Sequence, residues 1–235
     1  MSTEKADVTT IVAKGLLGAI PFVGPLAAEI VGTIIPNQRI DRIESILRLL
    51  EAKIAEYDRQ KVRERIVSPE YVDLMEDGFW QAARALSEER KDYIASLLKN
   101  TLTDDELKHI EYKRLMSILD ELNDLEILIL KSKSLEQWQQ PEYNEFWNIH
   151  GDSLKSSRPT IGNATQEKID KYAIHKTHTL HLINLGLLKG SFKSMKQGEL
   201  PEFDQETGMV KATSYDITML GRLLLRSIDQ AAPEP

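Results

Sequence analysis

Hydrophobic residues are most concentrated near the start of the chain, where residues 8–35 contain only two charged side chains, Lys14 and Glu29. Two prolines divide this run, and a proline inside a helix removes a hydrogen bond and clashes with the preceding turn. The pattern therefore predicts a hairpin of two short helices, about residues 10–20 and 25–35. Each helix would be about 16 Å long, which is about half the thickness of a bilayer's hydrocarbon core.

Small residues in this predicted hairpin suggest close packing. Gly24, Ala28 and Gly32 recur every four residues, so they share one helical face and let another backbone approach. The hairpin is either the buried centre of a soluble bundle or an element that several chains insert into a membrane after a trigger. The residues expected to pack or act there are Gly15, Gly18, Pro21, Gly24, Ala28 and Gly32.

Apolar residues at steps of three and four continue after the hairpin and predict a helical bundle over residues 1–130. One long amphipathic helix is expected over residues 38–66, with an apolar seam that packs within the chain or against another chain. Ser68, followed by proline and glutamate, should cap the next helix. A connecting segment follows over residues 131–165, with one short helix near residues 141–148. The seam consists of Ile40, Ile43, Leu47, Leu50, Ile54 and Tyr57.

The pattern changes again over residues 166–230. A helix over residues 166–185 ends at a glycine, which tolerates the left-handed backbone of a helix C-terminus. Strands are predicted over residues 187–192 and 210–217, joined by a polar tip, and a threonine then caps a last helix. Helix, strand, long turn, strand and helix form the layout of a winged helix. The expected fold is mainly α, a helical bundle with a C-terminal winged-helix-like module carrying a small β-hairpin.

Composition narrows the chemistry. The 235 residues include no cysteine, which excludes disulfides, cysteine-ligated zinc and thiol catalysis. The first ten residues lack the basic region of a secretory signal, so we expect a cytoplasmic protein that associates with a membrane only when activated. Nucleotide-binding loops, serine-hydrolase elbows and zinc-protease motifs are missing from the sequence. We therefore expect no enzyme activity and no cofactor.

Basic residues gather in the last third of a chain whose net charge is −7. Between Lys155 and Lys196 there are eight basic and two acidic residues. In a winged helix the third helix and the wing meet DNA, which would make binding salt-sensitive. The acidic balance of the whole chain favours instead a surface for a protein partner or a second copy. The candidate binding residues are Lys168, Lys171, Lys176, Lys189, Lys193 and Lys196.

Three histidines, His175, His178 and His181, lie three residues apart in the same predicted helix. At 100° per residue they spread over about 120° of the helix surface, so at most two neighbours could share a metal ion. We expect solvated or capping histidines and no metal site.

Two segments near the end of the chain resemble a known family. They are Asn184-Leu185-Gly186-Leu187-Leu188 and Tyr215-Asp216-Ile217-Thr218-Met219-Leu220-Gly221-Arg222. Together they look like the end of many bacterial winged-helix domains and are similar to the C-terminal half of the Abi-alpha-type abortive-infection proteins. Residues 19–29 resemble the glycine-rich start of a group of uncharacterised bacterial proteins.

This resemblance implies a bacterial origin and a part in antiviral defence. The first hypothesis is a non-enzymatic, oligomeric abortive-infection protein whose N-terminal hairpin acts on a membrane or an assembled partner. The second is a DNA-binding regulator that uses the helix over residues 166–185 and the wing. The third is a purely structural protein-interaction module.

Overall fold

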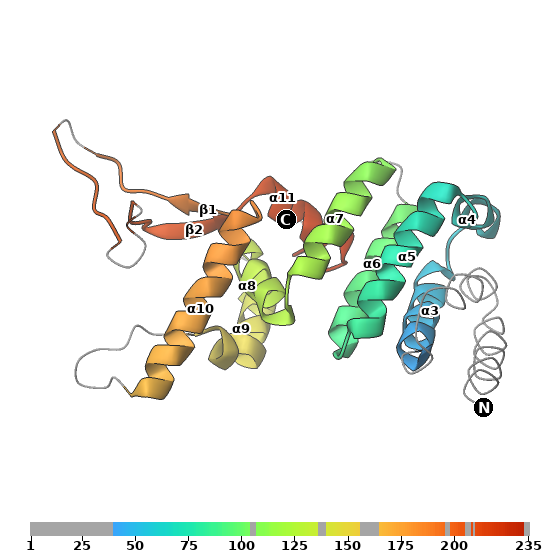
Figure 1. Cartoon of the computed structure of the whole chain (residues 1–235), viewed down its shortest axis with the longest axis horizontal. Helices are drawn as coiled ribbons and strands as arrows, with labels where there is room; N and C mark the ends of the chain where they lie inside the picture. The colour runs from blue at the N-terminus through green and yellow to red at the C-terminus, as the bar shows by residue number, and fades with distance from the viewer. Residues whose placement is uncertain are drawn as a thin grey trace, which may run out of the picture. The chain divides into compact units, whose positions relative to one another are not determined.

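The computed structural model describes residues 40–103, 107–135, 140–155, 165–195, 198–204, 208 and 210–232. Within these residues the chain is mainly helical, with nine helices and one two-stranded antiparallel sheet (Figure 1). The predicted mainly helical fold with a small hairpin is therefore confirmed. The predicted N-terminal hairpin, with Gly15, Gly18, Pro21, Gly24, Ala28 and Gly32, lies outside the described residues.

The chain divides into two compact units, which we describe separately. The first comprises Met1–Glu121 and Ser227–Asp229, and the second comprises Leu122–Arg226 and Gln230–Pro235. The described helices of the first unit are α3 (Ile40–Ile54), α4 (Arg59–Ile66), α5 (Pro69–Arg84), α6 (Glu88–Thr103) and α7 (His109–Glu121).

The single long helix expected over residues 38–66 is wrong, because the chain breaks between α3 and α4. Asp58 caps α4, and its carboxylate accepts a hydrogen bond from the backbone N–H of Gln60 at 2.8 Å. Aspartate at a helix N-terminus satisfies donors that have no partner within the helix, so it favours a new start over a continued helix. Tyr57, expected in the apolar seam, is exposed in this break.

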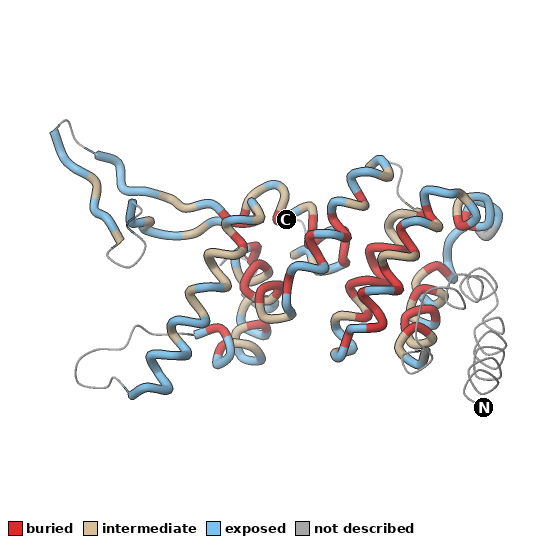
Figure 2. Tube along the Cα trace, in the orientation of Figure 1, coloured by how far each residue is buried: buried red, intermediate tan, exposed pale blue. Residues whose placement is uncertain are grey.

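Most of the seam is buried inside the first unit. Ile43, Leu47 and Leu50 are completely buried where α3 packs against α5 and α6 (Figure 2). The apolar face of α3 therefore packs within its own chain. Ser68 caps α5 as predicted, since its hydroxyl accepts a hydrogen bond from the backbone N–H of Tyr71 at 3.3 Å.

A short C-terminal segment, Ser227–Asp229, belongs to this first unit. The Asp229 carboxylate accepts hydrogen bonds from the Lys99 ammonium at 2.9 Å and the Asn100 amide at 3.2 Å, and pairs with Lys53 at 3.6 Å. Burial opposes ionisation of Asp229, but the hydrogen bonds from Lys99 and Asn100 outweigh it and hold its pKa below the ordinary value. The charged carboxylate thus fastens this segment to α3 and α6.

The second unit contains four described helices and the hairpin. Its elements are α8 (Asp124–Ser134), α9 (Gln140–Leu154), α10 (Gln166–Asn184), β1 (Leu188–Ser191), β2 (Ser214–Ile217) and α11 (Met219–Ser227). Helix α9 extends beyond the short helix expected near residues 141–148. The two strands are shorter than predicted, because their ladder runs only from the Leu188–Ile217 pair to the Ser191–Ser214 pair.

Helix α10 passes into β1 through a glycine-dependent turn. Gly186 has a φ of 74°, the left-handed conformation that glycine adopts at little cost. The Leu187 N–H donates to the Leu182 carbonyl and the Gly186 N–H to the Ile183 carbonyl, both at 2.9 Å. This pair of bonds is a Schellman motif, and it confirms the glycine predicted to end this helix.

Gly221 lets α11 cross very close to the start of β1. A Cβ atom at this position would lie 2.6 Å from the Leu187 carbonyl oxygen and 2.8 Å from a side-chain carbon of Ile217. The preceding Thr218 hydroxyl accepts a hydrogen bond from the Gly221 N–H at 3.1 Å, which confirms the threonine cap predicted for the last helix. It also donates to the Gly186 carbonyl at 2.7 Å. The glycine of the Leu-Gly-Arg segment is therefore required by packing.

Replacing Gly221 should destabilise the second unit. We expect Gly221→Ala to lower the free energy of unfolding by about 1–3 kcal/mol, because the new methyl group meets a backbone oxygen that cannot move alone. Chemical denaturation followed by circular dichroism measures this change. Gly151→Ala in α9 is the matched control, because its Cβ would lie 3.6 Å from its nearest neighbours and should leave stability unchanged or improve it. Equal denaturation midpoints for the two variants would contradict the packing argument.

Candidate functional site

The long connection between β1 and β2 carries several exposed apolar side chains among its described residues. We call its described residues, 192–195, 198–204, 208 and 210–213, the arm; they extend away from the strands in Figure 1. A bridge between Phe203 and Val210 joins its two sides. The Lys211 N–H donates to the Glu202 carbonyl and the Thr213 N–H to the Ser191 carbonyl, both at 2.8 Å.

Large apolar side chains of the arm face solvent. Phe192 is 57% exposed, Leu200 85% and Phe203 59%, and Met195 and Val210 are also exposed. Soluble monomers rarely gather such side chains on one surface unless that surface binds something. The sequence pattern predicts two strand ends and a polar tip over these residues, so it misses this apolar surface. Apolar residues recur among the glycines and acidic residues of this connection, and this recurrence was the sequence signal for an apolar surface.

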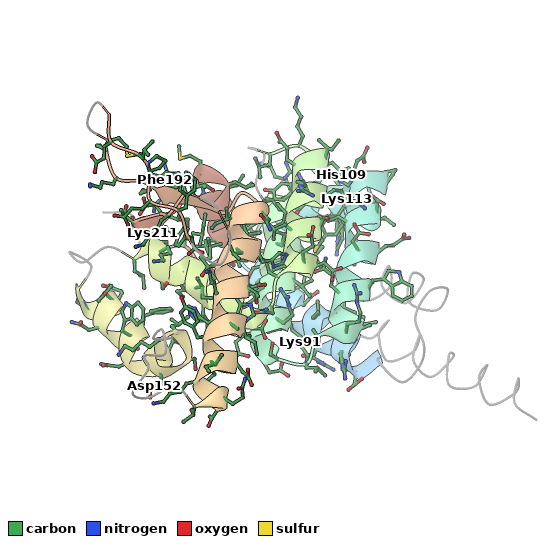
Figure 3. The ribbon with its side chains drawn as sticks, turned by 60° about the vertical axis from the view of Figure 1, so that its left-hand side comes forward. Lys91, His109, Lys113, Asp152, Phe192 and Lys211 are labelled. Carbon is green, nitrogen blue, oxygen red and sulfur yellow. The ribbon has the colours of Figure 1, made fainter. Side chains whose placement is uncertain are left out.

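The arm also contains a cavity of about 570 Å³. Its apolar lining includes Phe192, Met195, Leu200, Pro201 and Val210. This volume lies in the range of sites that hold a small molecule or several side chains of a partner. Figure 3 labels Phe192 and Lys211, an apolar and a charged residue that both line the cavity.

Charged residues of both signs stand around the cavity. The Lys193 ammonium lies 2.6 Å from the Glu199 carboxylate, and the Lys211 ammonium lies 3.2 Å from the Glu202 carboxylate. Three of these four side chains are more than half exposed, so the pairs add little to stability. They do, however, cancel most of the positive potential that the lysines alone would create.

The structure distributes the six candidate lysines over different surroundings. Lys168 and Lys171 are exposed in the first half of α10. Lys176, further along this helix, pairs with Asp204 of the arm at 3.3 Å, so it ties α10 to the arm. In the hairpin, Lys189 lies opposite Asp216 in the ladder.

Lys193 belongs to the charged pair with Glu199, and Lys196 lies outside the described residues. Of the five described lysines, only Lys168 and Lys171 share one exposed stretch of helix away from the arm's carboxylates. They share that solvated stretch with Glu167 and Asp170, so its charge is mixed.

The first half of α10 is largely exposed. Ile169 and Ile174, two apolar residues of the predicted helix, are exposed, and Leu182 is the one fully buried residue among those described in this helix (Figure 2). Apolar spacing predicts the helix correctly, but no neighbouring element covers that face in the described part of the chain.

Two of the three histidines converge on a buried carboxylate. Glu126 of α8 is 3% exposed, and one of its oxygens lies 3.1 Å from His178 Nδ1 and 2.9 Å from His181 Nδ1. Its other oxygen accepts a hydrogen bond from the Asn123 N–H at 2.9 Å, which completes a capping box. His175 turns elsewhere, with Nε2 2.9 Å from the Leu154 carbonyl.

The geometry of the Glu126 cluster fastens α10 to the N-terminus of α8. In the parts of the chain that the structure describes, no group of three or more potential ligands is arranged to hold a metal ion. Sequence reasoning misses Glu126 as the partner of the histidines. Its capping-box spacing from Asn123 is visible in the sequence, but a contact between residues 52 positions apart has no local signature.

A second titratable cluster joins α5 to α7 in the first unit. The Asp73 carboxylate lies 2.9 Å from the Lys113 ammonium and 3.1 Å from His109 Nε2, and Lys113 also pairs with Asp77 at 2.6 Å (Figure 3). The hydrogen bond from Lys113 holds the pKa of Asp73 below its ordinary value, although burial opposes it. Burial opposes the charge on Lys113, but bonds to Asp77 and Asp73 raise its pKa. These groups hold the two helices together.

None of the described helices has both the length and the apolar composition needed to cross a bilayer. Comparison with known proteins adds no assignment, because no family model, curated protein or solved structure matches this chain. Its own surfaces therefore supply the functional evidence.

Proposed function

We propose that this is a non-enzymatic interaction protein that recognises another protein through the apolar cavity of its arm. The observation that carries the proposal is the exposure of Phe192, Leu200 and Phe203 beside a cavity of about 570 Å³. Burying one large apolar side chain contributes about 1.5–3 kcal/mol, so a partner that covers several of them gains substantial affinity.

The construction of the arm supports binding coupled to ordering. A two-stranded ribbon is at best marginally stable alone in water, and the β1–β2 ladder contains only four residue pairs. A partner that packs on the arm would supply the apolar cover that the ribbon lacks. The charged pairs at the rim would then set orientation and specificity more than affinity.

The charge of the arm favours a protein over a nucleic acid. Residues 192–213 contain three lysines and four acidic residues, so the segment is slightly negative. A wing that follows a phosphate backbone needs an excess of positive charge. Apolar side chains surrounded by mixed charges are instead typical of the centre and rim of a protein interface.

Site-specific photo-crosslinking tests this proposal without requiring that the partner be identified first. A photo-reactive phenylalanine analogue at Leu200 should give one discrete protein adduct in the cells that naturally produce the chain. The same analogue at Leu86, which is 84% exposed in the first unit, is the matched control and should give none. Adding Val210→Asp should reduce the adduct, because a charge at the cavity wall opposes burial. No adduct at position 200, or equal adducts at both positions, would contradict the proposal.

A second candidate function, DNA binding, is favoured by the order of elements in the second unit. Helices α8, α9 and α10 precede the β1–β2 hairpin, as three helices precede the wing in winged-helix proteins. Lys168 and Lys171 on α10 would then meet the phosphate backbone. The acidic arm in the position of the wing makes this the weaker candidate.

A salt titration of duplex DNA binding separates the two candidates. If α10 meets DNA, Lys168→Glu with Lys171→Glu should weaken binding and reduce the slope of log affinity against log salt by about two, one for each lysine that no longer neutralises a phosphate. Lys133→Glu, at an exposed position of α8, is the control and should change neither. Absence of any binding at low salt would dismiss this candidate.

We further propose that the N-terminal apolar segment acts on a membrane in bacterial defence. This proposal rests on the sequence of residues 8–35 and on the resemblance to abortive-infection proteins. Helix α3 directly follows the segment, and its buried residues Ile43, Leu47 and Leu50 would anchor any such element to the first unit.

Dye release from liposomes tests this membrane proposal. The full-length protein should release dye under its activating condition, and Gly24→Leu should reduce release because a leucine blocks close approach of another backbone. Gly151→Ala, far along the chain in α9, should release dye like the original sequence. No release under any condition, together with a wholly cytosolic cell fraction, would contradict the proposal.

A further inference from the structure

We propose that the partner of the arm is a second copy of this chain, and that two copies place Phe203 reciprocally into each other's cavities. This inference rests on the proposed function of the arm and specifies its partner. The resulting interface would be isologous, with the same surface on both subunits.

The arm carries both halves of a self-complementary contact. Among its described residues, Phe203 is 59% exposed and does not line the cavity, although it belongs to the same ribbon. The cavity of about 570 Å³ is larger than one aromatic side chain and is walled by Phe192, Met195 and Val210. A two-fold axis between two arms would place a projecting aromatic ring of each copy against an apolar hollow of the other. Aromatic side chains that fill pockets near the centre of an interface commonly dominate its affinity.

The charges of the arm also fit a second copy. Lysines and carboxylates stand around each cavity as the pairs Lys193–Glu199 and Lys211–Glu202. A strongly acidic or strongly basic partner would meet repulsion from half of these groups. Two antiparallel copies can instead exchange partners, so that each lysine still meets a carboxylate across the interface. Nearly balanced charge on one surface is what an isologous contact requires.

The backbone of the arm leaves room for such pairing. The β1–β2 ladder ends at Ser191 and Ser214, and beyond it the two sides are joined by the Phe203–Val210 bridge and the Lys211 and Thr213 bonds. In the described part of the chain the sheet has two strands, so each strand has an outer edge, and such edges are templates for pairing with another chain.

The mass of the purified full-length protein in solution is the first measurement. Light scattering coupled to size exclusion should give twice the chain mass of 26.7 kDa at micromolar concentration. Phe203→Asp should weaken self-association at least about 30-fold, as expected when a central aromatic anchor is removed. Leu86→Asp, an equally polar change at an exposed leucine of the first unit, should leave the dimer intact. Unchanged circular dichroism of Phe203→Asp shows that the variant remains folded.

Cysteine pairing then identifies the surface. Because the chain has no cysteine, Phe203→Cys and Ala212→Cys can each be introduced alone, the second at the cavity wall. Mixing the two proteins under mild oxidation should give a disulfide-linked heterodimer. Mixing Phe203→Cys with Leu86→Cys should not.

A monomeric purified protein, or a dimer unaffected by Phe203→Asp, would overturn this inference. The proposed function of the arm is tested by a different result, so the two proposals can fail independently. If the purified chain is monomeric but photo-crosslinking at position 200 gives an adduct with a different protein, the arm binds a partner that is not a second copy. If neither contact is found, both proposals are wrong.

Discussion

The close approach of α11 to the start of β1 is the constraint on which the second unit depends. Because Gly221 has no side chain, the helix can lie against the Leu187 carbonyl, where a Cβ atom would be only 2.6 Å from that oxygen. Thr218 then bonds back to Gly186, so the end of α10, the base of the hairpin and the start of α11 form one fixed corner. Strand β1 leaves this corner and leads into the arm at residue 192.

The rigid corner and the exposed arm have different physical roles. Ile217, Leu187 and Leu224 are buried beside the corner, and the Glu126 cluster adds a polar bond between α8 and α10. The arm, in contrast, leaves Leu200 and Phe203 in water, so these side chains do not contribute the stabilisation that their burial would give. The well-packed corner therefore holds an exposed apolar ribbon, which is available for contact with another protein. This contrast between a covered base and an uncovered arm is the physical basis of the proposed interaction.

Local patterns in the sequence predict much of the fold, because caps and turns depend on neighbouring residues. Ser68 and Gly186 occupy the positions expected of a helix cap and a helix end. The break at Asp58 is missed because the apolar spacing continues through it. Spacing alone does not show whether one helix continues or a second helix starts there. The spacing also does not tell whether Ile174 is buried or exposed, for a related reason. An apolar stripe predicts a helix, but whether another element covers the stripe is decided by the tertiary structure.

The candidate site is less predictable than the fold. The lysines of the last third are found by counting charge, whereas their carboxylate partners, such as Asp204 for Lys176, lie far away in sequence. The apolar arm is hidden among polar residues, since Phe203 has no periodic neighbours that mark it as a contact residue. Non-local pairing and exposure are properties of the folded chain, and a linear pattern does not contain them.

Amide hydrogen exchange tests most directly whether the arm is covered by protein in the working state. Exchange would be measured in the assembled chain, either self-associated or bound to the partner found by crosslinking. The Phe203→Asp variant would be measured under the same conditions for comparison. We expect slower exchange across residues 192–213 in the assembled chain, with unchanged rates in α3, α5 and α6. Equal exchange of the arm in both proteins would show that nothing covers it.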